Sequence, residues 1–128
     1  MTSFSDTMSD RFMMFSVNLI NLEKQICKTY AGRHIYGQLF RSGTSAGANY
    51  EEARAGESSA DFIHKMQISL KEFRESHYWI GLISAAKLID SQDSALIFIR
   101  SESKELANII AKSIFTAKTK ILKKTNKA

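Results

Sequence analysis

Apolar residues recur at intervals of three and four positions along most of the chain, a spacing that predicts helices. In the segment from Met8 to Thr29, one such stripe consists of Phe12, Phe15, Leu19, Leu22 and Ile26. A second helix is expected over about Arg33 to Ala55. Gly32 and Gly56 are the expected stops of these two helices, because glycine commonly ends a helix.

The third helix is expected from Ala60 to Leu88, after a start signal at Ser58 and Asp61. It carries two stripes. The first contains Phe62, Met66, Leu70, Phe73, His77 and Ile80, and the second contains Ile68, Glu72, Glu75, Trp79 and Leu82. Two stripes predict two packing partners.

A fourth helix follows a short break at 89–91, with Leu96, Ile99, Leu106 and Ile110 among its apolar positions. Connections of a few residues make consecutive helices antiparallel neighbours. The chain of 128 residues contains no proline, which normally breaks helices. We therefore expect an all-α protein, a single up-down-up-down four-helix bundle over residues 1–128.

The string G-x-S-x-G at Gly43 to Gly47 matches the nucleophile motif of hydrolases. That motif requires a strand before the serine, and here both flanks are helical. Two interpretations of the small residues remain: they let a neighbouring helix approach closely, or they leave room for a bulky partner such as Trp79. No catalytic residue is predicted, and we expect the protein not to be an enzyme.

Metal and cofactor chemistry finds little support. His34, His64 and His77 lack zinc-protease spacing, and the chain has no Glu-x-x-His pair for a di-iron bundle. We expect no metal and no cofactor, and we expect Cys27 to be a small buried hydrophobe in a reducing compartment. The N-terminus lacks the pattern of a signal peptide, and no apolar run approaches the length of a membrane span. The expected location is the cytoplasm.

Charged and polar residues occupy positions where the second and third helices should pack. Because charges removed from water must be paired, we expect a buried network or a subunit interface there. Its expected members are Arg41, Ser45, Asn49, Glu52, Lys71, Glu72, Glu75 and Trp79. In this network Arg41 and Lys71 would pair with the three glutamates, and Asn49 would bridge them.

The C-terminal end is strongly basic. Residues 112–128 hold six lysines and no acid, and the net charge of the whole chain is +5. Part of this positive charge is explained by the helix dipole, because cations near a helix C-terminus are favourable. One interpretation of the rest is a solvated lysine tail. The other is a phosphate-contacting surface for nucleic acid, made by Lys112, Lys118, Lys120, Lys123 and Lys124.

The central part of the chain closely resembles the four-helix bundle proteins encoded in 23S ribosomal RNA intervening sequences. The resemblance rests on Arg41 to Ala53, Ser58 to Met66 and Ile68 to Trp79. It implies homopentameric rings without enzymatic activity, and a similar fold serves diversity-generating retroelements as an accessory subunit that binds nucleic acid and a reverse transcriptase. The family's usual proline between the first two helices is replaced here by Ala31-Gly32-Arg33.

We therefore expect an oligomeric bundle, a homopentamer, that binds structured RNA or another nucleic acid through basic surface. The alternative is a structural or adaptor protein whose polar helix faces bind a protein partner.

Overall fold

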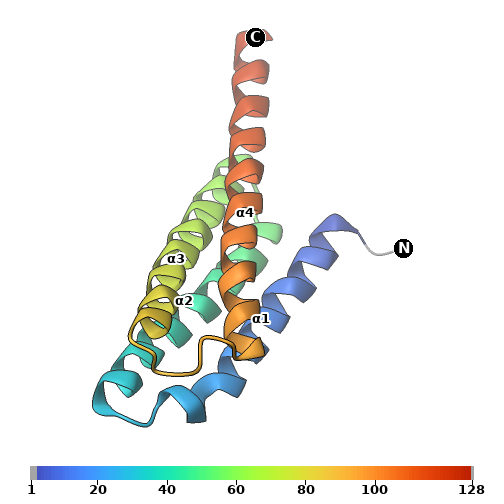
Figure 1. The fold of residues 1–128 in the computed structure, drawn as a ribbon. Coiled ribbons are helices and arrows are strands. Elements are labelled where there is room, and N and C mark those ends of the chain that lie inside the picture. Colours follow the sequence, from blue (N-terminus) through green and yellow to red (C-terminus); the bar gives the residue numbers. More distant parts are fainter. Residues whose placement is uncertain (1–2, 128) are drawn as a thin grey trace.

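The computed structural model describes residues 3–127, and four helices account for nearly all of them. They are α1 (Phe4–Ile26), α2 (Tyr30–Arg54), α3 (Ser59–Ala85) and α4 (Ser94–Lys127). Helix α2 packs between α1 and α3, and α4 packs on α3 and α1 (Figure 1). Each helix runs antiparallel to the one before it, so the predicted all-α, up-down-up-down bundle is confirmed.

Capping side chains explain where the helices begin. The hydroxyl of Thr29 accepts from the backbone N–H of Gly32, and that of Ser58 accepts from the N–H of Asp61. The expected role of Gly32 as the end of the first helix is wrong, because Gly32 lies in the first turn of α2. A Cβ atom there would lie 2.0 Å from the carbonyl oxygen of Ile26, so this tight connection requires glycine.

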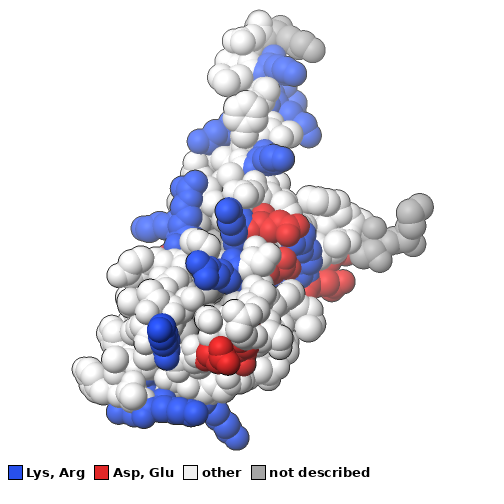
Figure 2. Space-filling view, in the orientation of Figure 1, with Lys and Arg blue, Asp and Glu red and all other residues white. Residues whose placement is uncertain are grey.

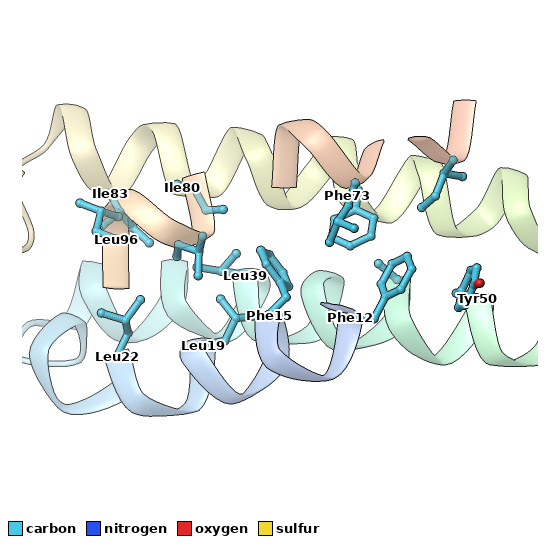
Figure 3. Packing of buried hydrophobic residues seen from close by; sticks show 14 of the residues in the cluster. Phe12, Phe15, Leu19, Leu22, Leu39, Tyr50, Phe73, Ile80, Ile83 and Leu96 are labelled. Carbon is cyan, nitrogen blue, oxygen red and sulfur yellow. The ribbon is translucent and has the colours of Figure 1, made fainter. Parts of the chain in front are cut away.

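The core is a single apolar cluster between the four helices (Figure 3). Helix α1 contributes the whole predicted stripe, each member at most 3% exposed. The ring of Phe12 stacks on Tyr50 of α2 at a centroid distance of 4.6 Å and lies 5.2 Å from Phe73 of α3. These contacts tie three helices together at one level of the bundle.

The two predicted stripes of α3 are only partly correct. Met66, Phe73 and Ile80 are buried, but His77 is exposed. The buried positions beside them are serines. The Ser69 hydroxyl donates to the carbonyl of Ala46 at 2.8 Å, and the hydroxyls of Ser76 and Ser42 are 2.8 Å apart. Small hydroxyl side chains with satisfied hydrogen bonds let α2 and α3 approach closely.

The small residues of the G-x-S-x-G string serve helix packing. A Cβ on Gly43 would lie 2.5 Å from Leu19 Cδ1, and one on Gly47 would lie 3.4 Å from Phe12 Cβ. At the two glycines the close neighbour is therefore α1 and not Trp79, whereas Ala46 of the same string contacts Ser69 of α3. No strand precedes the serine, since the whole string lies inside α2.

Helix α4 is the longest element and projects beyond the rest of the bundle (Figure 1). Its last buried residue is Ile114, which lines a groove with Gln67 and Leu70 of α3. The nine positions from 119 to 127 correspond to about 14 Å of helix. We call this segment the overhang.

Candidate nucleic-acid interface

The predicted polar network is present in part, between α2 and α3. The guanidinium of Arg41 donates to Glu72 at 3.2 Å and to Glu75, and Trp79 Nε1 donates to Glu75 at 3.0 Å. The hydrogen bonds from Trp79 and Arg41 hold the pKa of Glu75 below its ordinary value. However, the Arg41 side chain is 50% exposed, so this cluster lies at the surface and is not buried as expected.

Three expected members of that network have other partners or none. Glu52 pairs with Lys65 at 2.8 Å, because the antiparallel arrangement places the end of α2 beside the start of α3. Asn49 donates to the backbone carbonyl of Ser45 at 2.9 Å and bridges no charges. Within residues 3–126, Lys71 has no carboxylate within 4 Å, although its positive charge contributes to the lowered pKa of Glu75.

Ion pairs of Arg11 and Arg54, which the sequence did not indicate, join α1 to its neighbours. Arg11 donates to Glu102 of α4 through Nε at 3.0 Å and Nη2 at 2.6 Å, and it also contacts Glu105 at 3.0 Å. These carboxylates raise the pKa of Arg11. Arg54 pairs with Asp6 at 2.8 Å. Such pairs join residues far apart in the sequence, so no local pattern could reveal them.

The structure divides the five predicted phosphate-binding lysines between two sides of α4. Lys112, Lys120, Lys123 and Lys124 are exposed and line a groove of about 900 Å³, which we call the overhang groove. Its other walls include Phe4, Phe62, Ile109, Ile121 and the turn at 56–59. Figure 2 shows Lys and Arg side chains along the projecting end of α4 and no acidic ones on the side in view. The side chain of Lys127 lies outside the described part of the structure.

Lys118 lies instead against α3, on a second basic surface that the sequence analysis missed. We call it the α3–α4 face, and its cations are Lys71, Arg74, Arg100, Lys104 and Lys118. One groove of about 440 Å³ brings Lys118 together with Lys71 and Arg74. Another, of about 410 Å³, contains Arg100, Lys104 and His77.

No residue lining these two grooves is acidic. The ion pairs within residues 3–126 involve Arg11, Arg41, Arg54 and Lys65, and leave all five cations of the α3–α4 face without a carboxylate within 4 Å. In Figure 2, positive side chains continue from the projecting end of α4 over the middle of the molecule. The arrangement can hold anionic groups such as phosphates. Periodicity could have placed Lys71 and Arg74 on one side of α3, but their meeting with Lys118 depends on helix register.

Other candidate chemistries are not assembled in the part of the chain that the structure describes. Residues 3–127 contain no group of three or more His, Cys, Asp or Glu side chains that could hold a metal ion. Cys27 is half-buried at the end of α1, and burial raises the pKa of its thiol. None of the described helices is long and apolar enough to cross a membrane.

Comparison with known proteins identifies the family. The model of the 23S rRNA-intervening sequence protein family matches residues 7–112. The chain belongs to that family. A crystal structure of a protein of unknown function from the S23 ribosomal protein family of Bacteroides thetaiotaomicron is similar to it, with 33% sequence identity and a TM-score of 0.76. The alignment covers 86% of this chain and 96% of that protein. No curated protein matches the chain.

The two basic surfaces differ in whether they lie within the residues that the family model matches. The residues matched by the 23S rRNA-intervening sequence protein family include the α3–α4 face except for Lys118. Of the lysines around the overhang groove, only Lys112 falls within the matched residues. The lysine-rich overhang thus lies outside the segment that defines membership of the 23S rRNA-intervening sequence protein family.

Proposed function

We propose that this protein binds structured RNA or another nucleic acid, without catalysing a reaction, through the basic surface of α4. The observation that carries the proposal is the overhang, where Lys120, Lys123 and Lys124 are exposed beside Lys112. Lysines that replace the counterions of phosphates provide affinity that does not depend on base sequence. We place this activity in the cytoplasm, in line with the single cysteine and the family resemblance.

Removing three charges from the overhang tests this proposal. The variant Lys120→Gln/Lys123→Gln/Lys124→Gln should bind RNA more weakly than wild type. Each lost phosphate contact should reduce the slope of log affinity against log salt by roughly 0.7–0.9. The measurement is fluorescence anisotropy of a labelled RNA hairpin at several salt concentrations.

The matched control is Lys24→Gln/Lys28→Gln/Arg33→Gln, which removes the same net charge. These residues are exposed near the connection of α1 and α2, at the end of the bundle away from the overhang (Figure 1). The control should keep most of the affinity and the salt slope. If both variants behave alike, the overhang has no special part in binding. If wild type fails to bind any RNA at low salt, the adaptor role with a protein partner is favoured instead.

We also propose that the chain assembles into a ring of about five subunits. The outer side of α1 supports this, since Met13, Val17 and Ile20 lie at i, i+4 and i+7 and are 66%, 37% and 54% exposed. Exposed apolar stripes of this kind mark interaction surfaces, and a head-to-tail contact that closes gives a ring. Several basic overhangs on one ring would bind a single RNA with avidity.

Light scattering at micromolar concentration tests assembly. Wild type should have a mass near five times 14.4 kDa, and Met13→Glu/Ile20→Glu should shift to smaller species. Tyr30→Glu, which changes an exposed residue at the start of α2, should leave the mass unchanged. A wild-type mass of 14.4 kDa would rule out the ring.

A further inference from the structure

The α3–α4 face combines positive charge with exposed aromatic rings. Tyr78 is 63% exposed and lies one helical turn from Arg74 on the same side of α3. Phe115 is 73% exposed on α4 and lies one turn from Lys118. Neither ring is part of the core: Tyr78 meets only the edge of the half-buried Trp79 in a ring contact, and most of the surface of both rings stays open to a ligand.

The grooves of this face form a long track. Arg100 and Lys118 are 18 positions apart on α4, about 27 Å along the helix axis. Between their levels, Lys104 from α4 and Arg74 from α3 continue the positive charge. On the α2 side, Glu72 and Glu75 border the track, but both are paired with Arg41. An extended polyanion several nucleotides long would therefore meet cations along the whole track.

The exposed rings of Tyr78 and Phe115 favour single-stranded over double-stranded nucleic acid. In a duplex the bases are stacked on one another, and a protein surface contacts mainly the backbone and the groove edges. In a single strand the bases are free to stack on exposed aromatic side chains while cations follow the phosphates. Tyr78 and Phe115 offer such surfaces at the border of the cation-lined grooves.

We propose that the α3–α4 face is a binding track for single-stranded nucleic acid, in which Arg74, Arg100 and Lys104 contact phosphates and Tyr78 and Phe115 stack on bases. This inference rests on the proposed nucleic-acid function and adds to it a preferred strand form and a second location. The overhang contacts any polyanion, whereas the track selects unpaired segments.

The test uses the full chain and two labelled RNAs of equal length, a single-stranded 12-mer and a blunt duplex. Tyr78→Ala/Phe115→Ala should weaken binding of the single strand by about tenfold or more, and leave duplex binding within about twofold. Tyr30→Ala removes an 81% exposed ring from the start of α2 and should change neither affinity. Because all three rings are exposed, the variants should keep wild-type circular dichroism and melting temperature.

The phosphate contacts have a separate test. Arg74→Gln/Arg100→Gln should lower the affinity for the single strand and reduce its salt slope by roughly 1.4, at about 0.7 per contact on a single strand. Lys24→Gln/Arg33→Gln removes the same charge elsewhere and should leave the slope unchanged. A direct signal is also expected from Trp79, whose ring lies 5.0 Å from that of Tyr78: its emission should change when the single strand binds.

The outcomes separate this inference from the proposed function. Wild-type affinity of Tyr78→Ala/Phe115→Ala for the single strand, or equal losses for single strand and duplex, would overturn the track. If in addition the overhang variant loses affinity, nucleic-acid binding remains and the track alone fails. If wild type binds neither RNA at low salt, both proposals fail.

Discussion

Two glycines inside α2 have opposite surroundings. Around Gly43, Leu19 and Phe15 of α1 leave no room for a methyl group, and both side chains are fully buried. Around Gly37, no atom lies within 4 Å of the place where a Cβ would be, apart from the helix's own backbone. Both glycines lower the helix propensity of α2, but only Gly43 is required by packing.

Alanine substitutions should therefore act in opposite directions. Gly37→Ala should raise the free energy of unfolding by about 0.5–1 kcal/mol, because alanine is the better helix former. Gly43→Ala should lower it by about 1 kcal/mol, because overpacking of roughly 1–3 kcal/mol outweighs the gain in propensity. Urea denaturation measures both. A Gly43→Ala protein at least as stable as wild type would mean that α1 can move away from α2.

The sequence could indicate that residues 42–48 form a close helix contact, but it could not name the neighbouring helix. Small residues permit approach from any side, and two helices approach here: α1 packs on Gly43 and Gly47, and α3 packs on Ser42 and Ala46. Which of these residues face α1 and which face α3 depends on the rotation of α2 about its axis. That rotation is determined by core residues such as Leu39 and Tyr50, together with the buried serines that α2 and α3 share.

At the scale of the elements, the contact of α2 with α3 contains Trp79, the chain's single tryptophan. Its fluorescence can therefore follow the titration of the neighbouring Glu75. Trp79 donates to Glu75, whose pKa lies below its ordinary value of 4.5. The ionised form of Glu75 is therefore favoured by folding. Its contribution to stability is present above the ordinary pKa and is lost as pH falls through the lower pKa of the folded state.

Trp79 emission should accordingly change with a midpoint below pH 4.5 in the folded protein. Arg41→Met removes the second of the two hydrogen-bonding partners and should raise the midpoint part of the way toward the ordinary value. A fluorescence titration, with circular dichroism to confirm that the protein stays folded, measures both. A wild-type midpoint at or above pH 4.5 would show that the cluster does not form in solution.

The ion pair of Arg11 with Glu102, between α1 and α4, should contribute more to stability than the pair of Lys65 with Glu52, between α3 and α2. The side chains of Arg11 and Glu102 are 28% and 12% exposed and share two hydrogen bonds, whereas those of Lys65 and Glu52 are 37% and 59% exposed. Glu102→Gln should cost about 2 kcal/mol, because it weakens a charge-assisted pair and leaves Arg11 partly stranded.

Glu52→Gln is the matched comparison and should cost about 0–1 kcal/mol, as exposed pairs do. Thermal melts of both variants, converted to free energies, measure the difference. Equal and small costs for the two substitutions would mean that solvent reaches the Arg11 guanidinium more freely than the packing of α1 on α4 implies.

Helix periodicity and short connections were sufficient to predict the bundle and its topology, because both depend on local spacing. The α1–α4 pairing of Arg11 with Glu102 depends on register between distant helices, and so does the meeting of Lys71 with Lys118. The expected network formed only in part for the same reason: Arg41 meets Glu72 and Glu75, but Lys71 and Glu52 are not part of the cluster. The register of α2 against α3 places Glu52 beside Lys65.

For the whole molecule, the decisive feature is the difference in length between α4 and the other helices. Helix α4 has 34 residues and α3 has 27, and the lysine-rich end of α4 projects beyond the other helices (Figure 1). Lysines confined to the last turn would serve the helix dipole. Here the positive charge extends along the projecting segment and continues over the α3–α4 face, which makes a polyanion the best complement to this surface (Figure 2).

The most direct test of the nucleic-acid account is the salt dependence of RNA binding by the intact protein. Anisotropy of a labelled RNA at about 50 mM and about 200 mM salt gives the slope of log affinity against log salt. With four or more phosphate contacts, the slope should be about −3 or steeper, and changing the base sequence should leave it unaltered. No binding at about 50 mM salt, or binding that salt leaves unchanged, would contradict the account.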